Sequence, residues 1–76
     1  MSDLRNRERR LRYAAKKKGL YIQKGKNYVN YDQYSYDSYI GYSVGRLDIG
    51  LLIEGYDEWN SNLLTIEEAE EFVLKY

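Results

Sequence analysis

The residues of this chain best suited to chemistry are basic ones near its start. Arg5, Arg9, Arg12 and Lys16 recur at intervals of four, three and four residues. On a helix this spacing places them on one ridge, and several cations on one rigid face are what phosphate binding requires. A tyrosine and a further lysine lie beside this ridge, where the ring can stack or donate a hydrogen bond to a phosphate. The predicted nucleic-acid-binding residues are therefore Arg5, Arg9, Arg12, Tyr13, Lys16 and Lys17.

Basic and acidic residues are segregated along the chain, although the formal net charge is zero. Residues 1–26 hold ten basic and two acidic residues, a charge of +8, and residues 27–76 hold two basic and ten acidic residues, a charge of −8. Such an asymmetry indicates a surface for polyanions, or head-to-tail association between copies. The simpler alternative is a solvated basic helix that the acidic end of the chain partly neutralises.

Ten tyrosines in 76 residues are far more than an average composition supplies, and six of them fall in or beside residues 28–39, YVNYDQYSYDSY. These rings could stack on single-stranded bases, form an adaptable protein-binding surface, or simply cover a thin core. Asp32 and Asp37 place negative charge in the tract, which disfavours phosphate there. The candidate partner-binding residues are Tyr31, Tyr34, Tyr36 and Tyr39.

Catalysis and metal binding find little support in the composition. The chain has no His and no Cys, and it lacks a P-loop and a dinucleotide-binding glycine motif. The carboxylates of residues 67–71 lack the alternating oxygen ligands and central glycine of a calcium loop. We therefore expect a protein that is not an enzyme, with no cofactor, no metal site and no small-molecule substrate. Its acidic end is expected to be solvated or to dock a basic partner.

Size and hydropathy limit the architecture to one small domain over residues 1–76. No apolar run approaches the roughly 18–20 residues that span a bilayer, so no membrane association is expected. The basic N-terminal stretch is not followed by the apolar segment of a signal peptide. These features predict a cytoplasmic protein.

The elements that must position these residues follow from periodicity and capping signals. A basic helix is expected over residues 3–18, with Asp3 as N-cap and Gly19 as its left-handed end. Strands are expected over 20–24, 40–46 and 50–54, with a mobile Tyr-rich loop over 27–39. Thr65 and Glu68 form the capping box of an acidic helix over 66–75. The predicted fold class is α+β, in α-β-β-β-α order, with both helices on one face of a three-stranded antiparallel sheet.

Three segments carry a resemblance: RRLRYAAKKKGLYIQKGK (9–26), the IGYSV…GLLIEG hairpin (40–55) and LTIEEAEEFV (64–73). Together they resemble short hypothetical proteins of bacteria and their phages, which share a basic helix ending in KKxGL, a GY strand and a final LTxEEAE helix. The resemblance implies a small accessory domain and brings no known function. The element order is also that of the double-stranded-RNA-binding domain, whose second helix begins with lysines that contact phosphate. In this chain the second helix begins with the acidic segment Thr65–Glu68, which would repel phosphate. RNA binding is therefore not inferred from that likeness.

Two functional hypotheses follow. In the first, the chain is a bacterial or phage accessory domain that contacts DNA or RNA without sequence specificity through its basic helix. In the alternative, it is a protein-interaction module that uses the Tyr-rich segment and the acidic helix, with self-association as one form. A binding measurement on nucleic acid separates the two hypotheses.

Overall fold

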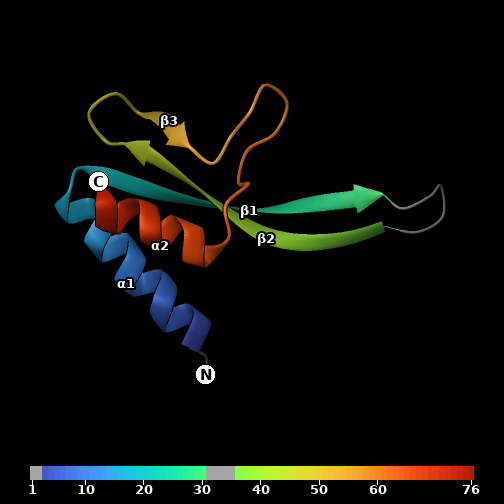
Figure 1. Ribbon diagram of the computed structural model, residues 1–76, viewed down its shortest axis with the longest axis horizontal. Helices are drawn as coiled ribbons and strands as arrows, with labels where there is room; N and C mark the ends of the chain where they lie inside the picture. The colour runs from blue at the N-terminus through green and yellow to red at the C-terminus, as the bar shows by residue number, and fades with distance from the viewer. Residues whose placement is uncertain (1–2, 31–35) are drawn as a thin grey trace.

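The computed structural model describes residues 3–30 and 36–76 as two helices and a three-stranded sheet (Figure 1). Along the chain these elements are α1 (Asp3–Lys17), β1 (Leu20–Asn30), β2 (Tyr36–Arg46), β3 (Leu51–Glu54) and α2 (Ile66–Lys75). Both strand pairs are antiparallel, and the order across the sheet is β1-β2-β3. The predicted α+β class and α-β-β-β-α order are confirmed.

Local sequence signals explain where α2 begins and where α1 ends. The Thr65 hydroxyl accepts a hydrogen bond from the backbone N–H of Glu68, and the Glu68 carboxylate accepts one from the N–H of Thr65, so the predicted capping box is present. The prediction of Asp3 as the N-cap of α1 is wrong, because Asp3 already belongs to the first turn of this helix. The helix is followed by Gly19 at φ 77°, the left-handed conformation that glycine adopts without steric cost.

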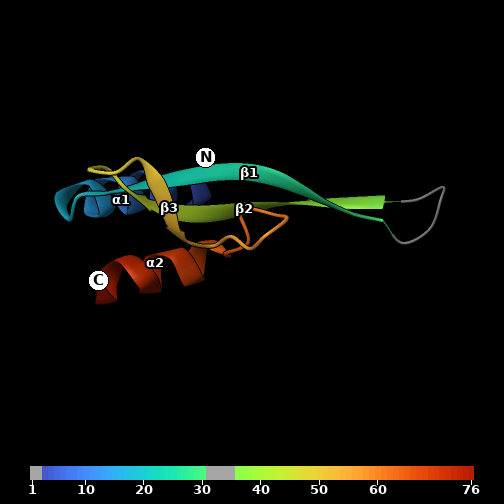
Figure 2. The same cartoon turned by 90° about the horizontal axis from the view of Figure 1, so that it is seen from above.

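The core lies between the two helices and one face of the sheet. The β1–β2 register places Ile22 opposite Val44, so alternate residues of both strands share this face. The buried apolar cluster joins residues of both helices and both long strands: Leu11, Ala15, Leu20, Ile22, Tyr42, Val44, Ile66, Ala69 and Val73. Both helices therefore pack against the same face, and Figure 2 shows α2 as a layer beside the sheet.

The β1–β2 hairpin is longer than predicted. Residues 27–30 belong to β1 and residues 36–39 to β2, so the prediction of a loop over 27–39 is wrong for these residues, while 31–35 lie outside the described part of the chain. Pairing continues through Asn27–Tyr39 to Asn30–Tyr36. Tyrosine and valine are good strand formers, and this preference outweighs the polar, low-complexity composition that suggested a loop. In Figure 1 the far half of the hairpin extends beyond both helices.

The outer edge of β2 is covered in two places. β3 pairs with Val44–Arg46 through an irregular register, and Leu64 exchanges two backbone hydrogen bonds of 2.9 Å with Tyr42. The loop between these two contacts, residues 55–63, is thereby tied to the sheet at both ends. In the described part of the chain, no helix combines the length and the apolar character needed to cross a bilayer.

Candidate nucleic-acid interface

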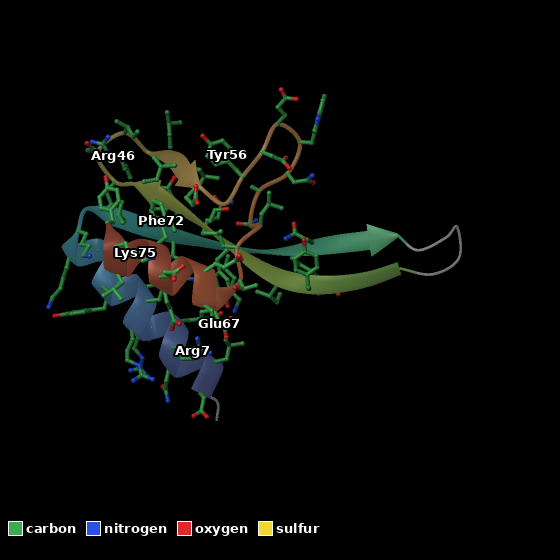
Figure 3. All side chains as sticks on the ribbon, in the orientation of Figure 1. Arg7, Arg46, Tyr56, Glu67, Phe72 and Lys75 are labelled. Atoms are coloured by element: carbon green, nitrogen blue, oxygen red, sulfur yellow. The ribbon has the colours of Figure 1, made fainter. Side chains whose placement is uncertain are left out.

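One side of α1 faces α2 and neutralises part of the acidic helix. The Arg7 guanidinium contacts Glu70 through Nη2–Oε1 (2.6 Å) and Nε–Oε2 (3.2 Å), and its Nη1 lies 3.3 Å from Glu67 Oε2. Figure 3 shows Arg7 and Glu67 facing each other across the two helices. Hydrogen bonding to Glu70 raises the pKa of Arg7. The basic and acidic helices therefore cancel some of each other's charge, as the simpler alternative expects.

A second basic side chain is also used inside the fold. Lys18 Nζ donates to the carbonyl oxygens of Val73 (2.6 Å) and Leu74 (3.0 Å), at the C-terminal end of α2. Carbonyls in the last turn of a helix lack regular intrahelical partners, and the helix dipole favours a cation at this position. Lys18 therefore caps α2 and does not belong to the free basic surface.

The side of α1 that faces β1 holds a carboxylate in a polar cluster. Glu8 Oε2 lies 2.9 Å from Lys24 Nζ and accepts a hydrogen bond from the hydroxyl of Tyr42, which is buried in the core. The Tyr42 hydrogen bond, followed by the one from Lys24, lowers the pKa of Glu8. Burial, with the hydrogen bond to Glu8, raises the pKa of Tyr42 to about 12. This cluster fastens α1 to the sheet.

The Glu8 cluster makes stability depend on pH. Since the pKa of Glu8 is lower in the folded than in the unfolded chain, its contribution is fully present above the ordinary pKa of 4.5 and is lost as the pH falls through the folded value. Glu8→Gln should lower the free energy of unfolding at neutral pH by about 1–3 kcal/mol. Urea denaturation at neutral pH and in steps below pH 4.5 measures this, and the difference from the unmodified protein should shrink on acidification.

The matched control is Glu71→Gln, which removes an exposed pair with Lys75 (Nζ–Oε2 3.6 Å). This change should cost less than about 0.5 kcal/mol, because exposed pairs contribute little. A Glu8→Gln deficit that stays constant as the pH falls would contradict the role given to the carboxylate.

The remaining side of α1 carries the basic ridge, defined as Arg5, Arg9, Arg12 and Lys16, and all four side chains are exposed. Among the residues that the structure describes, none of the four forms an ion pair with a carboxylate. Arg9 reaches Asn6 on the same helix (Nη2–Oδ1 3.3 Å), and Arg12 Nη1 donates to the carbonyl of Ile22 (3.0 Å). Folding thus brings the predicted ridge together. The carboxylate that interacts with it electrostatically is Glu8, whose pKa is lowered by Tyr42 and Lys24 and, to a smaller extent, by Arg12.

Tyr13 and Lys17 lie beside the ridge and contact each other. Lys17 Nζ is 4.9 Å from the centroid of the Tyr13 ring, and the tyrosine is 65% exposed. A cation over one face of the ring leaves the other face open to solvent. The six residues predicted to bind nucleic acid therefore share one continuous, exposed side of α1.

The predicted partner-binding tyrosines are only partly covered by the structure. Tyr31 and Tyr34 lie outside the described residues. Tyr36 is the first residue of β2, and the structure describes its backbone but not its side chain. Tyr39 lies opposite Asn27 on the hairpin and is 47% exposed. Of the four, Tyr39 alone has a side chain within the described part of the chain.

Two features near the ridge were not predicted from the sequence. Lys26 is exposed two residues after Lys24 on the same face of β1, so this face of the sheet also carries an exposed cation. A groove of about 190 Å³ also runs between α1 and β1. We call it the α1–β1 groove; it is lined by Arg12, Lys16, Leu20, Tyr21, Ile22 and Leu47. Strand alternation gives a signal for Lys26, whereas the groove depends on tertiary packing.

Comparisons of the chain with protein-family models, with curated protein sequences and with solved structures find no match. The functional argument therefore depends on the charges and contacts of the chain itself. Within the described ranges, no group of three or more carboxylates is placed to share a metal ion.

Proposed function

We propose that the protein binds nucleic acid through the basic ridge of α1, by contacts to phosphate and without sequence specificity. The observation that carries the proposal is the division of the basic residues on α1. Arg7 is neutralised by α2, whereas the ridge is exposed and forms no ion pair among the described residues. Four exposed cations that form no ion pair among the described residues, on one rigid helix, attract a polyanion and release its counterions on binding.

The dimensions of the ridge suit a phosphate backbone. Between Arg5 and Lys16 a helix rises about 16 Å, at about 1.5 Å per residue. One strand of a duplex advances about 3.4 Å per phosphate along its axis, so the ridge is as long as about four or five phosphates. No side-chain arrangement on α1 resembles a module that reads base edges, so the contacts are expected to be insensitive to sequence.

The test is fluorescence anisotropy of labelled duplex and single-stranded oligonucleotides, titrated with protein at two salt concentrations. Four phosphate contacts give a slope of about −3.6 in log K against log salt, so the affinity for duplex should fall about 150-fold between about 50 and 200 mM salt. An affinity that is independent of salt, or no binding at the lower salt concentration, would contradict the proposal.

The preference for duplex or single-stranded oligonucleotides shows which groups of the protein contact the nucleic acid. Duplex DNA has the higher charge density, so tighter duplex binding is expected if the ridge acts through phosphates alone. A preference for single strands would instead add stacking on the open face of Tyr13. The alternative function, a protein-interaction module, loses part of its predicted surface, because Glu67 and Glu70 of α2 are already bound to Arg7.

A further inference from the structure

An ordered turn after β3 holds the chain's only tryptophan in solvent. The Asp57 carboxylate accepts hydrogen bonds from the backbone N–H groups of Trp59 (2.8 Å) and Asn60 (2.7 Å), and the Asp57 N–H donates to the Asn60 carbonyl (2.8 Å). These three bonds fix the backbone of residues 57–60, which we call the Trp59 turn. The Trp59 side chain is nevertheless 85% exposed. A large apolar side chain presented on a fixed turn is typical of a docking element.

The surroundings of Trp59 are acidic. Glu54, Asp57 and Glu58 are exposed near the turn, and residues 47–74 contain no Lys or Arg. Tyr56, labelled in Figure 3, is half exposed and adds aromatic surface next to the turn. An occupant of this surface must therefore offer an apolar cavity with a cationic rim. Two Trp59 turns facing each other would place carboxylates against carboxylates, which disfavours a symmetric contact.

The α1–β1 groove has the complementary character. The buried Leu20 and Ile22 form its apolar floor, Tyr21 and the half-exposed Leu47 also line it, and the exposed Arg12 and Lys16 form its rim, with no carboxylate among the lining residues. An indole can bury its ring on such a floor, and Arg or Lys can contact its face. In Figure 1 the loop that contains the turn rises on one side of the sheet while α1 lies on the other, so the two surfaces are separate regions of one copy.

We propose that the Trp59 turn of one copy docks into the α1–β1 groove of a second copy, in a head-to-tail arrangement. The apolar knob and the acidic flanks of the turn match the apolar floor and the cationic rim of the groove. A contact between two different surfaces repeats from copy to copy, and the assembly is a chain or a ring. Because Arg12 and Lys16 belong to both the groove and the basic ridge, nucleic acid and the second copy compete for them.

The test combines sedimentation velocity with the fluorescence of Trp59, which reports on its own burial. At about 50 mM salt, the sedimentation coefficient should rise and the tryptophan emission should shift to shorter wavelength over about 1 µM to 1 mM protein. Trp59→Ser should weaken the association about 30-fold or more. The control Leu74→Ser removes a side chain of similar exposure (78%) at a separate groove between α1 and α2, and should leave the association unchanged.

A charge swap tests the orientation of the contact. Lys16→Glu and Glu58→Lys, each alone, should weaken association at least about fivefold by creating like-charge pairs. Both changes in one chain should restore it, because each contact then again joins opposite charges. A protein that remains monomeric at every concentration overturns the proposal. So does association that Trp59→Ser leaves intact, or single reversals that the double variant does not rescue.

Discussion

We expect that reversing two charges of the basic ridge, Arg9→Glu with Lys16→Glu, lowers the affinity for a duplex oligonucleotide by about 60-fold or more at about 0.1 M salt. Each lost phosphate contact removes about 0.9 from the slope of log K against log salt, so two lost contacts reduce the slope by about 1.8. Among the described residues, neither side chain forms an ion pair, and Arg9 bonds only within α1. Arg12 is left intact because it also donates to the Ile22 carbonyl. Anisotropy at several salt concentrations measures both effects.

The chain offers a matched control for this variant. Arg46 and Lys75 are its only basic residues beyond residue 26, and both lie outside the basic ridge and form surface pairs, with Asp48 and Glu71. Arg46→Glu with Lys75→Glu changes the net charge by the same amount and should keep the slope of the unmodified protein. Far-UV circular dichroism checks that both variants remain folded. Equal losses of affinity in both would assign binding to net charge and would contradict a site on the ridge.

The ends of the helices could be predicted from local sequence because their determinants are local. The Thr65–Glu68 capping box is made by residues three apart, and Gly19 takes a left-handed conformation that its residue type favours. The length of the β1–β2 hairpin, in contrast, could not be predicted from local sequence. Its far half extends beyond both helices in Figure 1, and residues 27–39 lack the alternation of apolar and polar residues that marks a half-buried strand. Backbone pairing between the two strands of the hairpin, from Asn27–Tyr39 to Asn30–Tyr36, decides that segment.

The membership of the ridge was predictable, because helical spacing alone places Arg5, Arg9, Arg12 and Lys16 on one side. The sequence did not predict which basic residues remain exposed to solvent and which form contacts within the fold. Arg7 finds Glu67 and Glu70 across 60 and 63 residues of sequence, and Lys18 finds the end of α2 across 55. These contacts depend on how the two helices pack side by side, which no spacing in the sequence specifies. The structure therefore separates cations that hold the fold together from cations that face solvent.

The face of the sheet opposite the helices depends on close backbone packing against the loop before α2. Asn62 lies over this face with φ 60°, and its N–H donates to the hydroxyl of Ser43 (2.6 Å), a fully buried side chain. The Asn62 carbonyl accepts a hydrogen bond from Asn27 Nδ2 (2.6 Å). A Cβ atom on Gly41 would overlap that same carbonyl oxygen, so only glycine allows the loop to approach β2 this closely.

Gly41→Ala should therefore destabilise the domain by about 3 kcal/mol or more, because the added atom meets backbone that cannot move without breaking the Asn62 contacts. A domain of this size has a free energy of unfolding of only about 4–11 kcal/mol, so a large part of its stability would be lost. Urea denaturation followed by far-UV circular dichroism measures the effect. The control is Gly50→Ala, at φ 70° with no atom within 4 Å of the added Cβ, which should cost only about 1–2 kcal/mol of backbone strain. Equal losses in the two variants would mean that the loop does not need Gly41, and that Asn62 can move away from β2 at little cost.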